Sequence, residues 1–368
     1  MVVHAVGARP NFVKMAPVVG ALGAGSRVRQ IVVHTEQHYD RHLADDVLAD
    51  LDFREPDFVL GVGSGSHAEQ TGRALVAFER VLLEVEPDLV VVAGDVNSTL
   101  ACALAAVKVG VAVAHVESGL RSRDWTMPEE INRVLTDRLS DLLFTHSPEA
   151  GENLVAEGIE PDRIHYVGNT MIDSLRRLEP RARAARAWER FDVREGDYVL
   201  VTLHRPSNVD RPDRLAAVTR ALTRLASRHP VLFPVHPRTR ARLAAAGIEE
   251  SLSGGGVACI DPLRYLDFLS LETAAGAIVT DSGGIQEEAS ALGVPCYTLR
   301  PNTERPITLT HGTNVLLGDD PAAFDRVRVA AARAPSAIPL WDGHAGERIA
   351  RTIEAYLDVS PPAVAVGS

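Results

Sequence analysis

The chain has 368 residues, of which 46% are hydrophobic and 24% are charged, and its formal net charge is −11. This composition is that of an ordinary soluble globular protein, and the length predicts about two domains. No apolar run approaches the ~20 residues of a membrane helix, and an acidic chain without a basic stripe disfavours non-specific binding of nucleic acid.

The N-terminus and the cysteines both indicate a cytoplasmic protein. The first residues, MVVHAVGARPNF, contain a short apolar run that ends at Gly, Arg and Pro. A secretory signal would place basic residues first and a longer apolar core after them, so we predict a buried first strand instead. Cys102, Cys259 and Cys296 are scattered and odd in number. This pattern argues against a disulfide framework or a zinc site and fits a reducing compartment.

The first half of the chain alternates apolar runs with amphipathic stretches. Near-continuous apolar runs predict buried parallel strands; they are Val2–Val6, Gln30–His34, Leu89–Ala93, Ala112–Val116 and Leu142–Thr145. The longer stretches between them, such as Ala68–Val85 and Thr99–Val109, predict crossover helices. This half closes near Tyr166–Thr170.

The second half repeats the pattern after a basic, alanine-rich segment, Leu178–Arg190, which we predict to be a helix or linker. The predicted strands are Tyr198–Leu203, Val231–Val235, Ala258–Ile260, Ala277–Thr280 and Pro295–Thr298, and the predicted helices include Arg214–Arg228, Gly284–Leu292 and Ala345–Leu357. We therefore predict two doubly wound α/β domains, residues 1–175 and 176–358, with a ligand cleft between them and a disordered tail at residues 359–368.

Carboxylates follow two of the predicted strands in the first domain. Asp95 comes just after Leu89–Ala93, and Glu117 comes just after Ala112–Val116. Glu129 and Glu130 open the helix that begins at Pro128, where acidic residues also complement a helix N-terminus. Each acid alone is explained by a turn or a helix end. Three acids at one edge of a sheet push one another's pKa values apart, which provides an acid and a base at neutral pH and indicates proton transfer.

A glycine-containing turn in the second domain is a candidate phosphate site. The strand Ala277–Thr280 leads through Asp281 into Ser282-Gly283-Gly284 and then into a helix. Glycines allow backbone N–H groups to approach an anion, and a helix N-terminus favours the negative charge of that anion. A tight turn without a ligand is the alternative interpretation of the same sequence. Glu288, on the helix that follows, is the candidate acceptor of ribose hydroxyls by analogy with dinucleotide folds.

An anionic ligand also needs cations, because the chain is acidic. The candidates are Arg9 and Lys14 after the first strand, and Arg305. His204 and His236 each follow a predicted strand and are candidates to face the cleft, although a lone histidine in such a place is often structural. No spacing of His, Cys or acidic residues indicates a metal site, and no nucleophile elbow is present.

These motifs together resemble one known family, the non-hydrolysing UDP-N-acetylglucosamine 2-epimerases. The resembling segments keep one order along almost the whole chain. They are GARPNFVKMAPV (7–18), QHYD (37–40), GDVNSTLA (94–101), HVESGLRS (115–122), MPEEINR (127–133), GNTMIDSL (168–175), LHRPSNVD (203–210), PVHP (234–237), TDSGGIQEEA (280–289) and TERPITLTHGTN (303–314).

The resemblance implies a fold and a mechanism. The fold is GT-B-like, with two Rossmann-like doubly wound domains facing across a cleft, and the last helix is free to pack back on the N-terminal domain. The family implies a homodimer that acts on a UDP-sugar without a metal or nicotinamide cofactor. UDP is eliminated across C1–C2 to give a bound 2-acetamidoglucal, and it adds back after C2 is protonated on the opposite face.

The resemblance also assigns residues. Asp95, Glu117 and Glu129 match the family's acid/base carboxylates, and His204 matches the histidine near the diphosphate and leaving group. The UDP-binding positions match Arg9, Lys14, Ser282, Gly283, Gly284, Glu288 and Arg305, and Phe268 is a candidate to line the uracil pocket.

Some segments depart from the family pattern. Pro206 and Ser207 precede Asn208 where many members have Glu-Asn directly after His-Arg, and Tyr39 follows Gln37-His38 where many have Arg. Gln37, His38, Arg205 and His236 resemble parts of a second, activating UDP-sugar site in some members. A modified sugar, such as a diacetamido or uronate variant, remains open. So do a hydrolysing epimerase, a GT-B glycosyltransferase and a non-catalytic sensor.

Overall fold

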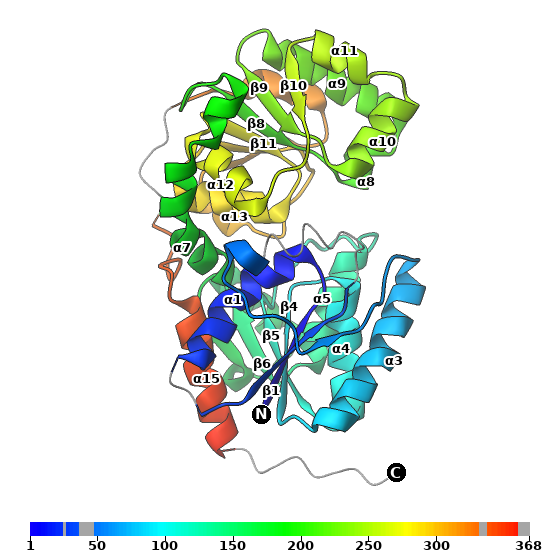
Figure 1. Ribbon diagram of the computed structural model, residues 1–368, viewed down its shortest axis with the longest axis vertical. Coiled ribbons are helices and arrows are strands. Elements are labelled where there is room, and N and C mark those ends of the chain that lie inside the picture. Colours follow the sequence, from blue (N-terminus) through cyan, green and yellow to red (C-terminus); the bar gives the residue numbers. More distant parts are fainter. Residues whose placement is uncertain (25–26, 37–47, 331–336, 360–368) are drawn as a thin grey trace. The chain divides into compact units, whose positions relative to one another are not determined.

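The computed structural model describes residues 1–24, 27–36, 48–330 and 337–359, with only the backbone of Arg9 and Val359. The chain forms two compact units (Figure 1). Unit 1 comprises Met1–Ser174 and the C-terminal segment from Pro339, and unit 2 comprises Leu175–Ile338. The last helix, α15 (Ala345–Val359), therefore belongs to unit 1, where it packs against α1 (Arg9–Gly23). Residues 360–368, most of the predicted tail, lie outside the described residues.

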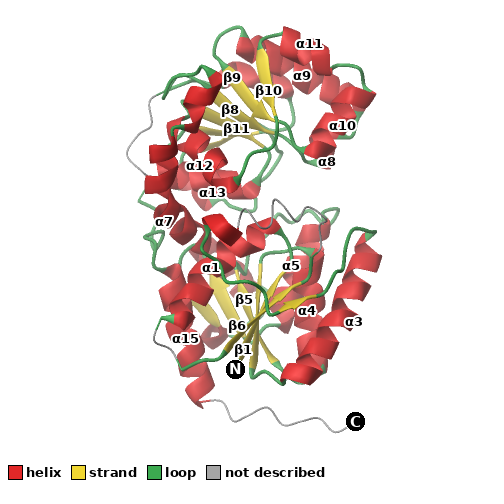
Figure 2. Ribbon diagram, viewed as in Figure 1, coloured by secondary structure: helices red, strands yellow, loops and turns green. Residues whose placement is uncertain are grey.

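Unit 1 is built on a parallel sheet with helices on both faces. Its seven described strands are ordered β3-β2-β1-β4-β5-β6-β7. They are β1 (Val2–Val6), β2 (Gln30–His34), β3 (Phe58–Val59), β4 (Leu89–Ala93), β5 (Ala112–Val116), β6 (Leu142–Thr145) and β7 (Ile164–Tyr166). Helices α3 (His67–Val85), α4 (Asn97–Lys108) and α5 (Pro128–Leu139) pack side by side, whereas α1 and α15 lie across the sheet from them (Figure 2). Helix α6 (Pro148–Ala156) connects β6 to a short 3₁₀ turn, Pro161–Arg163, before β7.

Helix α7 (Thr170–Ala185) carries the chain from unit 1 into unit 2, and a 3₁₀ helix (Ala187–Phe191) follows it. Unit 2 has a second parallel sheet, whose described strands are ordered β10-β9-β8-β11-β12-β13. They are β8 (Val199–Thr202), β9 (Val231–Pro234), β10 (Val257–Ile260), β11 (Ala277–Thr280), β12 (Cys296–Thr298) and β13 (Asn314–Leu316). The helices are α8 (Pro206–Val209), α9 (Pro212–Ala226), α10 (Pro237–Ala245), α11 (Glu249–Gly254), α12 (Tyr265–Ala274), α13 (Gly283–Leu292) and α14 (Ile307–Thr310), with a 3₁₀ helix at Pro321–Arg326.

The apolar strands fold this way because both faces of each sheet are covered. In unit 1, Val3, Val90 and Val92 pack against Phe78 and Leu82 of α3, which lie one helical turn apart. In unit 2 the equivalent core joins the strands β8, β9 and β11 to the apolar face of α9. The prediction of two doubly wound parallel α/β units is therefore confirmed. None of the helices in the described part of the chain is long and apolar enough to cross a membrane.

The strand order of each sheet indicates where a ligand is expected to bind. In unit 1 the chain reverses its direction of winding between β1 and β4, and in unit 2 it does so between β8 and β11. Open α/β sheets bind ligands beyond the carboxyl ends of the strands at such a switch point. Asp95 follows β4, and His204 and Asp281 follow β8 and β11, so these residues lie where each unit is expected to bind a ligand.

Candidate functional site

Glu117, directly after β5, is a buried acid in an unusual backbone conformation. Its φ is 68°, a left-handed value that is rare for residues other than glycine and is concentrated at functional sites. Its side chain pairs with Lys14 of α1, whose Nζ lies 2.7 Å from Glu117 Oε1. The same ammonium lies 3.0 Å from the position of a Cβ atom added at Gly94, the residue before Asp95. Lys14 therefore connects the ends of β4 and β5.

Asp95 has a different cation. Its Oδ2 lies 2.5 Å from Nη2 of Arg133, whose Nη1 also contacts Glu130 at 3.0 Å. Arg133 is almost fully buried, whereas 22% of the Asp95 side chain is exposed. The Asn132 side chain donates to the Asp95 carbonyl oxygen at 2.9 Å. Helix α5 therefore holds Asp95 by both its side chain and its backbone.

The two neighbouring acids at the start of α5 have separate roles. Glu130 is buried and accepts hydrogen bonds from the Ser122 N–H and hydroxyl and from the Arg123 N–H, so it fixes the loop after β5. Glu129 is half-buried and, among the described residues, has no hydrogen-bond or ion-pair partner. Glu129 is thus the acid of this pair that remains available to a ligand.

Asp137 is a connecting residue that the sequence analysis did not single out. Its Oδ1 lies 2.6 Å from Nδ1 of His115, and its Oδ2 accepts from Arg121 at 2.7 Å and from the Gly119 N–H at 3.1 Å. Nε2 of His115 lies 2.8 Å from the Gly94 carbonyl oxygen. This buried cluster ties together the loops that carry Asp95 and Glu117. Both His115 and Arg121 lie in the HVESGLRS motif, which was the available signal.

In unit 2, the N-terminus of α13 is open. Ser282 is the N-cap residue, and its side chain makes no capping hydrogen bond. The Ser282 side chain therefore leaves the first N–H groups of the helix uncapped, and uncapped N–H groups at a helix N-terminus are suited to bind an anion. A Cβ atom added at Gly283 would lie 2.4 Å from Arg305 Nη1, so only glycine allows this close approach. Gly284 continues the first turn of the helix.

Arg305 belongs to a buried ion network. Its guanidinium contacts Glu304 and also Glu287, whose Oε1 lies 3.1 Å from Nε. Glu304 in turn pairs with Arg300 at 2.7 Å and contacts Arg205 at 3.7 Å. The structure thus brings Arg305 to the Ser282–Gly284 turn but balances its charge with carboxylates.

His204 is oriented by Asp281, the residue directly after β11. Nδ1 of His204 lies 3.2 Å from Asp281 Oδ1, and Asp281 also accepts from the Arg205 N–H and the Asn208 side chain. Burial acts to raise the pKa of Asp281, but the hydrogen bonds from His204, Asn208 and Arg205 and the His204 charge hold it below its usual value. Because Nδ1 is engaged, Nε2 is the ring nitrogen that a ligand would meet.

The remaining predicted residues lie in several places. The ring of His236 lies 5.6 Å from that of His204, and its Nδ1 accepts the Arg238 N–H at the start of α10. Glu288 of α13 is buried and accepts the Tyr265 hydroxyl at 2.6 Å, and Phe268, on the same helix as Tyr265, is half-buried. Gln37, His38 and the side chain of Arg9 lie outside the described residues.

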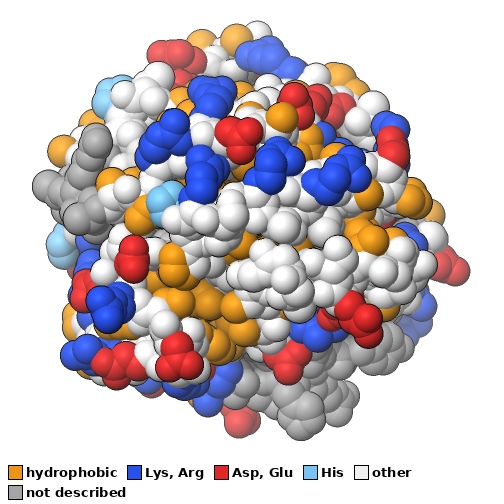
Figure 3. Space-filling view, turned by 90° about the horizontal axis from the view of Figure 1, so that it is seen from above, with side chains coloured by type: hydrophobic (Ala, Val, Ile, Leu, Met, Phe, Trp, Pro, Cys, Tyr) orange, Lys and Arg blue, Asp and Glu red, His pale blue; other side chains and the backbone are white. Residues whose placement is uncertain are grey.

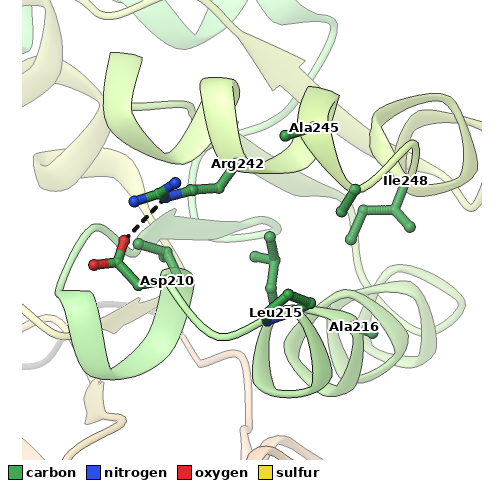
Figure 4. Close-up of a pocket in the computed structure, with 9 residues that line it drawn as sticks. Asp210, Leu215, Ala216, Arg242, Ala245 and Ile248 are labelled. Carbon is green, nitrogen blue, oxygen red and sulfur yellow. Dashed lines mark hydrogen bonds and ion pairs between the residues drawn. The ribbon is translucent and has the colours of Figure 1, made fainter.

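Unit 2 also contains a cavity of about 350 Å³ away from these residues (Figure 4). Val209, Leu215 and Ile248 give it an apolar lining, and at its edge Asp210 pairs with Arg242 at 3.1 Å. None of the predicted site residues lines this cavity.

Arginine side chains gather on the face of unit 2 shown in Figure 3. Several arginines of α9 and α10 have acidic partners: Asp325 lies 3.7 Å from Arg224, Asp210 contacts Arg238 and Arg242, and Arg240 pairs with Asp261 at 3.1 Å. This surface is therefore mixed in charge rather than a basic stripe. In the described residues, no three His, Cys, Asp or Glu side chains are grouped to hold a metal ion.

Comparison with known proteins matches this geometry to one family. The family model for UDP-N-acetylglucosamine 2-epimerase matches residues 21–354. The UDP-N-acetylglucosamine 2-epimerase of Methanocaldococcus jannaschii is 42% identical over 95% of this chain and 97% of its own length. Its crystal structure in complex with UDP-GlcNAc and UDP superimposes with a TM-score of 0.89 at 40% identity, covering 96% of this chain and 99% of the other.

A second relative has a different substrate in its name. The UDP-2,3-diacetamido-2,3-dideoxy-D-glucuronate 2-epimerase of Pseudomonas aeruginosa is 41% identical over 85% of this chain and 87% of its own length. Both relatives are 2-epimerases of UDP-linked acetamido sugars. The carboxylates of unit 1, the open helix turn of unit 2 and these similarities lead to one conclusion: the chain is a member of the UDP-N-acetylglucosamine 2-epimerase family.

Proposed function

We propose that the protein is a non-hydrolysing epimerase that interconverts UDP-N-acetylglucosamine and UDP-N-acetylmannosamine. The observation that carries this proposal is the carboxylate set of unit 1. Asp95 and Glu117 are each paired with a buried cation, and Glu129 has no partner in the described part of the chain. Simple binding of a nucleotide sugar requires no such set, whereas inversion at C2 requires a proton to be removed on one face and returned on the other.

The reaction proceeds in two halves. A carboxylate removes the C2 proton, the C2–H electrons form the C1–C2 double bond, and UDP leaves from C1 with the C1–O electron pair. The bound 2-acetamidoglucal then receives a proton at C2 on the opposite face, and a phosphate oxygen of UDP forms the new C1–O bond. Atoms and charge balance without a cofactor, because UDP is both the leaving group and the returning nucleophile.

Unit 2 supplies the UDP site in this proposal. The N–H groups at the start of α13 and the Ser282 hydroxyl stabilise the charge that develops on the diphosphate. Nε2 of His204, whose other nitrogen is held by Asp281, lies near the leaving oxygen. Glu288 accepts the ribose hydroxyls, and Phe268 lines the uracil pocket. Arg305, beside the Ser282–Gly284 turn, contacts the phosphates, and Glu287 and Glu304 balance its charge.

Unit 1 supplies proton transfer. Lys14 pairs with Glu117 and Arg133 pairs with Asp95, so each of these carboxylates is held in place by a buried cation. Glu129 completes the set at the start of α5. Lys14, expected to contact UDP, contributes here through its pair with Glu117.

A modified sugar is the second candidate substrate. It is favoured by the 41% identity to the diacetamido-glucuronate epimerase, which is close to the identity with the UDP-N-acetylglucosamine enzyme. The same carboxylates perform the same inversion on either sugar. The difference therefore lies in recognition at C3 and C6 rather than in the mechanism.

Product identity tests the function. The purified protein is incubated separately with UDP-N-acetylglucosamine and with the diacetamido-glucuronate nucleotide, and the products are separated by anion-exchange chromatography. The proposal expects UDP-N-acetylmannosamine from the first and little turnover of the second. Turnover of the second alone would establish the modified substrate. Free N-acetylmannosamine with UDP would establish a hydrolysing enzyme, and transfer to an acceptor without an epimer would establish a transferase.

We also propose a cytoplasmic homodimer. Cys102, Cys259 and Cys296 are free, as expected in a reducing compartment. On unit 1, exposed apolar side chains line α3 (Val76 and Leu83, seven residues apart) and α5 (Ile131 and Leu135, four residues apart). Each spacing places its pair on one face of a helix, and such a face is typical of a subunit interface. Light scattering after size exclusion tests this state: a mass of one chain for the wild type would contradict it.

A further inference from the structure

Glu272 is a buried acid to which the proposed mechanism assigns no role. It lies in the last turn of α12, and its side chain is 0% exposed. Neither carboxylate oxygen has a conventional hydrogen-bond donor within the described part of the chain. A buried carboxylate in that situation is costly if it is ionised.

The neighbours of Glu272 explain how it is accommodated. Helices α12 and α13 pack together, and Glu288 of α13 interacts with it. Tyr198 and Cys296 also lie within electrostatic reach of Glu272. Burial, and then the charge and hydrogen bond of Glu288, raise the pKa of Glu272 well above its ordinary value. Burial, with a smaller effect from Glu272, likewise raises the pKa of the Tyr198 hydroxyl.

Two buried carboxyl groups in contact do not both ionise, so the pair shares one proton. Glu288 already accepts the Tyr265 hydroxyl at 2.6 Å, which stabilises its charged form. Glu272 has no such donor among the described residues. These contacts favour the neutral form of Glu272, with its O–H directed to Glu288.

We propose that Glu272 is a positioning residue for nucleotide recognition: as a neutral acid it donates a hydrogen bond to Glu288 and, together with Tyr265, fixes that carboxylate to accept ribose hydroxyls. This inference rests on the proposed function, which assigns the ribose to Glu288. An acid held between a phenol and a carboxylic acid keeps a defined orientation, and its remaining lone pairs are left for the ligand.

Two substitutions separate donation from packing. Glu272→Gln keeps the length of the side chain and a hydrogen-bond donor without a charge. Glu272→Met keeps the length and removes the donor. Glu288→Gln is the reference for loss of the ribose acceptor. Isothermal titration calorimetry of each full-length variant with UDP and with 2′,3′-dideoxy-UDP at pH 7 measures how strongly the ribose hydroxyls contribute to binding.

The ratio of the two dissociation constants is the informative quantity. We expect the wild type to prefer UDP by about tenfold or more, since hydrogen bonds to charged groups are of that order. Glu272→Gln retains the preference. Glu272→Met loses most of it through weaker UDP binding, while its affinity for dideoxy-UDP is unchanged. If Glu272 had only a structural role, Glu272→Met would weaken the binding of UDP and of dideoxy-UDP by the same factor.

Two results overturn the inference alone: full preference for UDP in Glu272→Met, or a loss in Glu272→Gln equal to that in Glu272→Met. A wild type that binds both nucleotides equally also overturns it while leaving UDP binding intact. A wild type that binds neither nucleotide overturns the proposed function, and this inference with it. Thermal unfolding of each variant at pH 6 shows whether a loss of binding reflects a loss of folding.

Discussion

Nζ of Lys14 lies 2.7 Å from Oε1 of Glu117, and 8% and 5% of the two side chains are exposed. This buried ion pair joins α1 to the loop after β5, at a residue whose backbone is in a left-handed conformation. Removing one partner of such a pair leaves an uncompensated charge in the interior, which costs more than the pair itself contributes.

Replacing Lys14 alone is therefore expected to destabilise the fold more than replacing the pair. Lys14→Met should lower the free energy of unfolding by about 3 kcal/mol. The double variant Lys14→Met/Glu117→Gln should recover a large part of that loss. Lys108→Met, on the exposed end of α4, is the control and should change stability little. Urea denaturation measures all four proteins, and equal losses in the single and double variants would refute the pairing argument.

The carboxylates of unit 1 should act on turnover rather than on nucleotide binding. Asp95→Asn, Glu117→Gln and Glu129→Gln should each lower kcat by about 10²–10⁴-fold, the usual contribution of general acid–base catalysis. UDP should still bind each variant by calorimetry. The exposed Glu152→Gln on α6 is the matched control. Near-normal turnover in all three variants would contradict the assignment of these carboxylates as catalytic acids and bases.

Glu130 should behave differently from its neighbour Glu129. Because it accepts hydrogen bonds from Ser122 and Arg123 and pairs with Arg133, Glu130→Gln should lower the free energy of unfolding by about 3 kcal/mol. Glu129→Gln should leave stability within about 0.5 kcal/mol. Thermal and urea unfolding compare the two. The reverse order would mean that the roles of these adjacent acids are exchanged.

Glu272 should make stability depend on pH. Its pKa in the folded protein is raised well above the value of 4.5, so the unfolded chain releases this proton first. The stability that Glu272 contributes is therefore complete below the unfolded-state pKa of 4.5. It is lost as the pH rises through the folded-state pKa. Glu272→Gln cannot ionise. The melting temperature of the variant relative to the wild type should therefore rise between pH 5 and pH 9, and a difference that stays constant would contradict the assignment.

The sequence predicted the strands that carry the site because they are buried on both faces and read as apolar runs. It missed β3, β7 and β13, which have two or three residues each and lie at or near the ends of the sheets. Strands at the ends of a sheet are covered less completely, so they need fewer apolar residues. Phe58–Val59 and Asn314–Leu316 accordingly contain no long apolar run. The segment Leu178–Arg190 proved to be helical up to Ala185.

Asp95, Glu117 and Ser282 could be identified as candidates because each belongs to a motif that follows a predicted strand. The contacts between distant segments were not predictable. Arg133 reaches Asp95 from α5, and Asp281 reaches His204 from the end of β11. Sequence alone also could not separate Glu129 from Glu130, because adjacent residues of a helix point about 100° apart and only packing decides which is buried. Glu272 did carry a signal: it is the single charged residue between Phe268 and Thr280.

Proton NMR of the protein with UDP-N-acetylglucosamine in D₂O tests the central claim most directly. Elimination and re-addition break and remake the C2–H bond, so solvent deuterium must enter there. We expect UDP-N-acetylmannosamine to form and the C2 proton signals of both epimers to be lost as deuterium enters. A C2 proton that keeps its full intensity while UDP remains able to bind would contradict it.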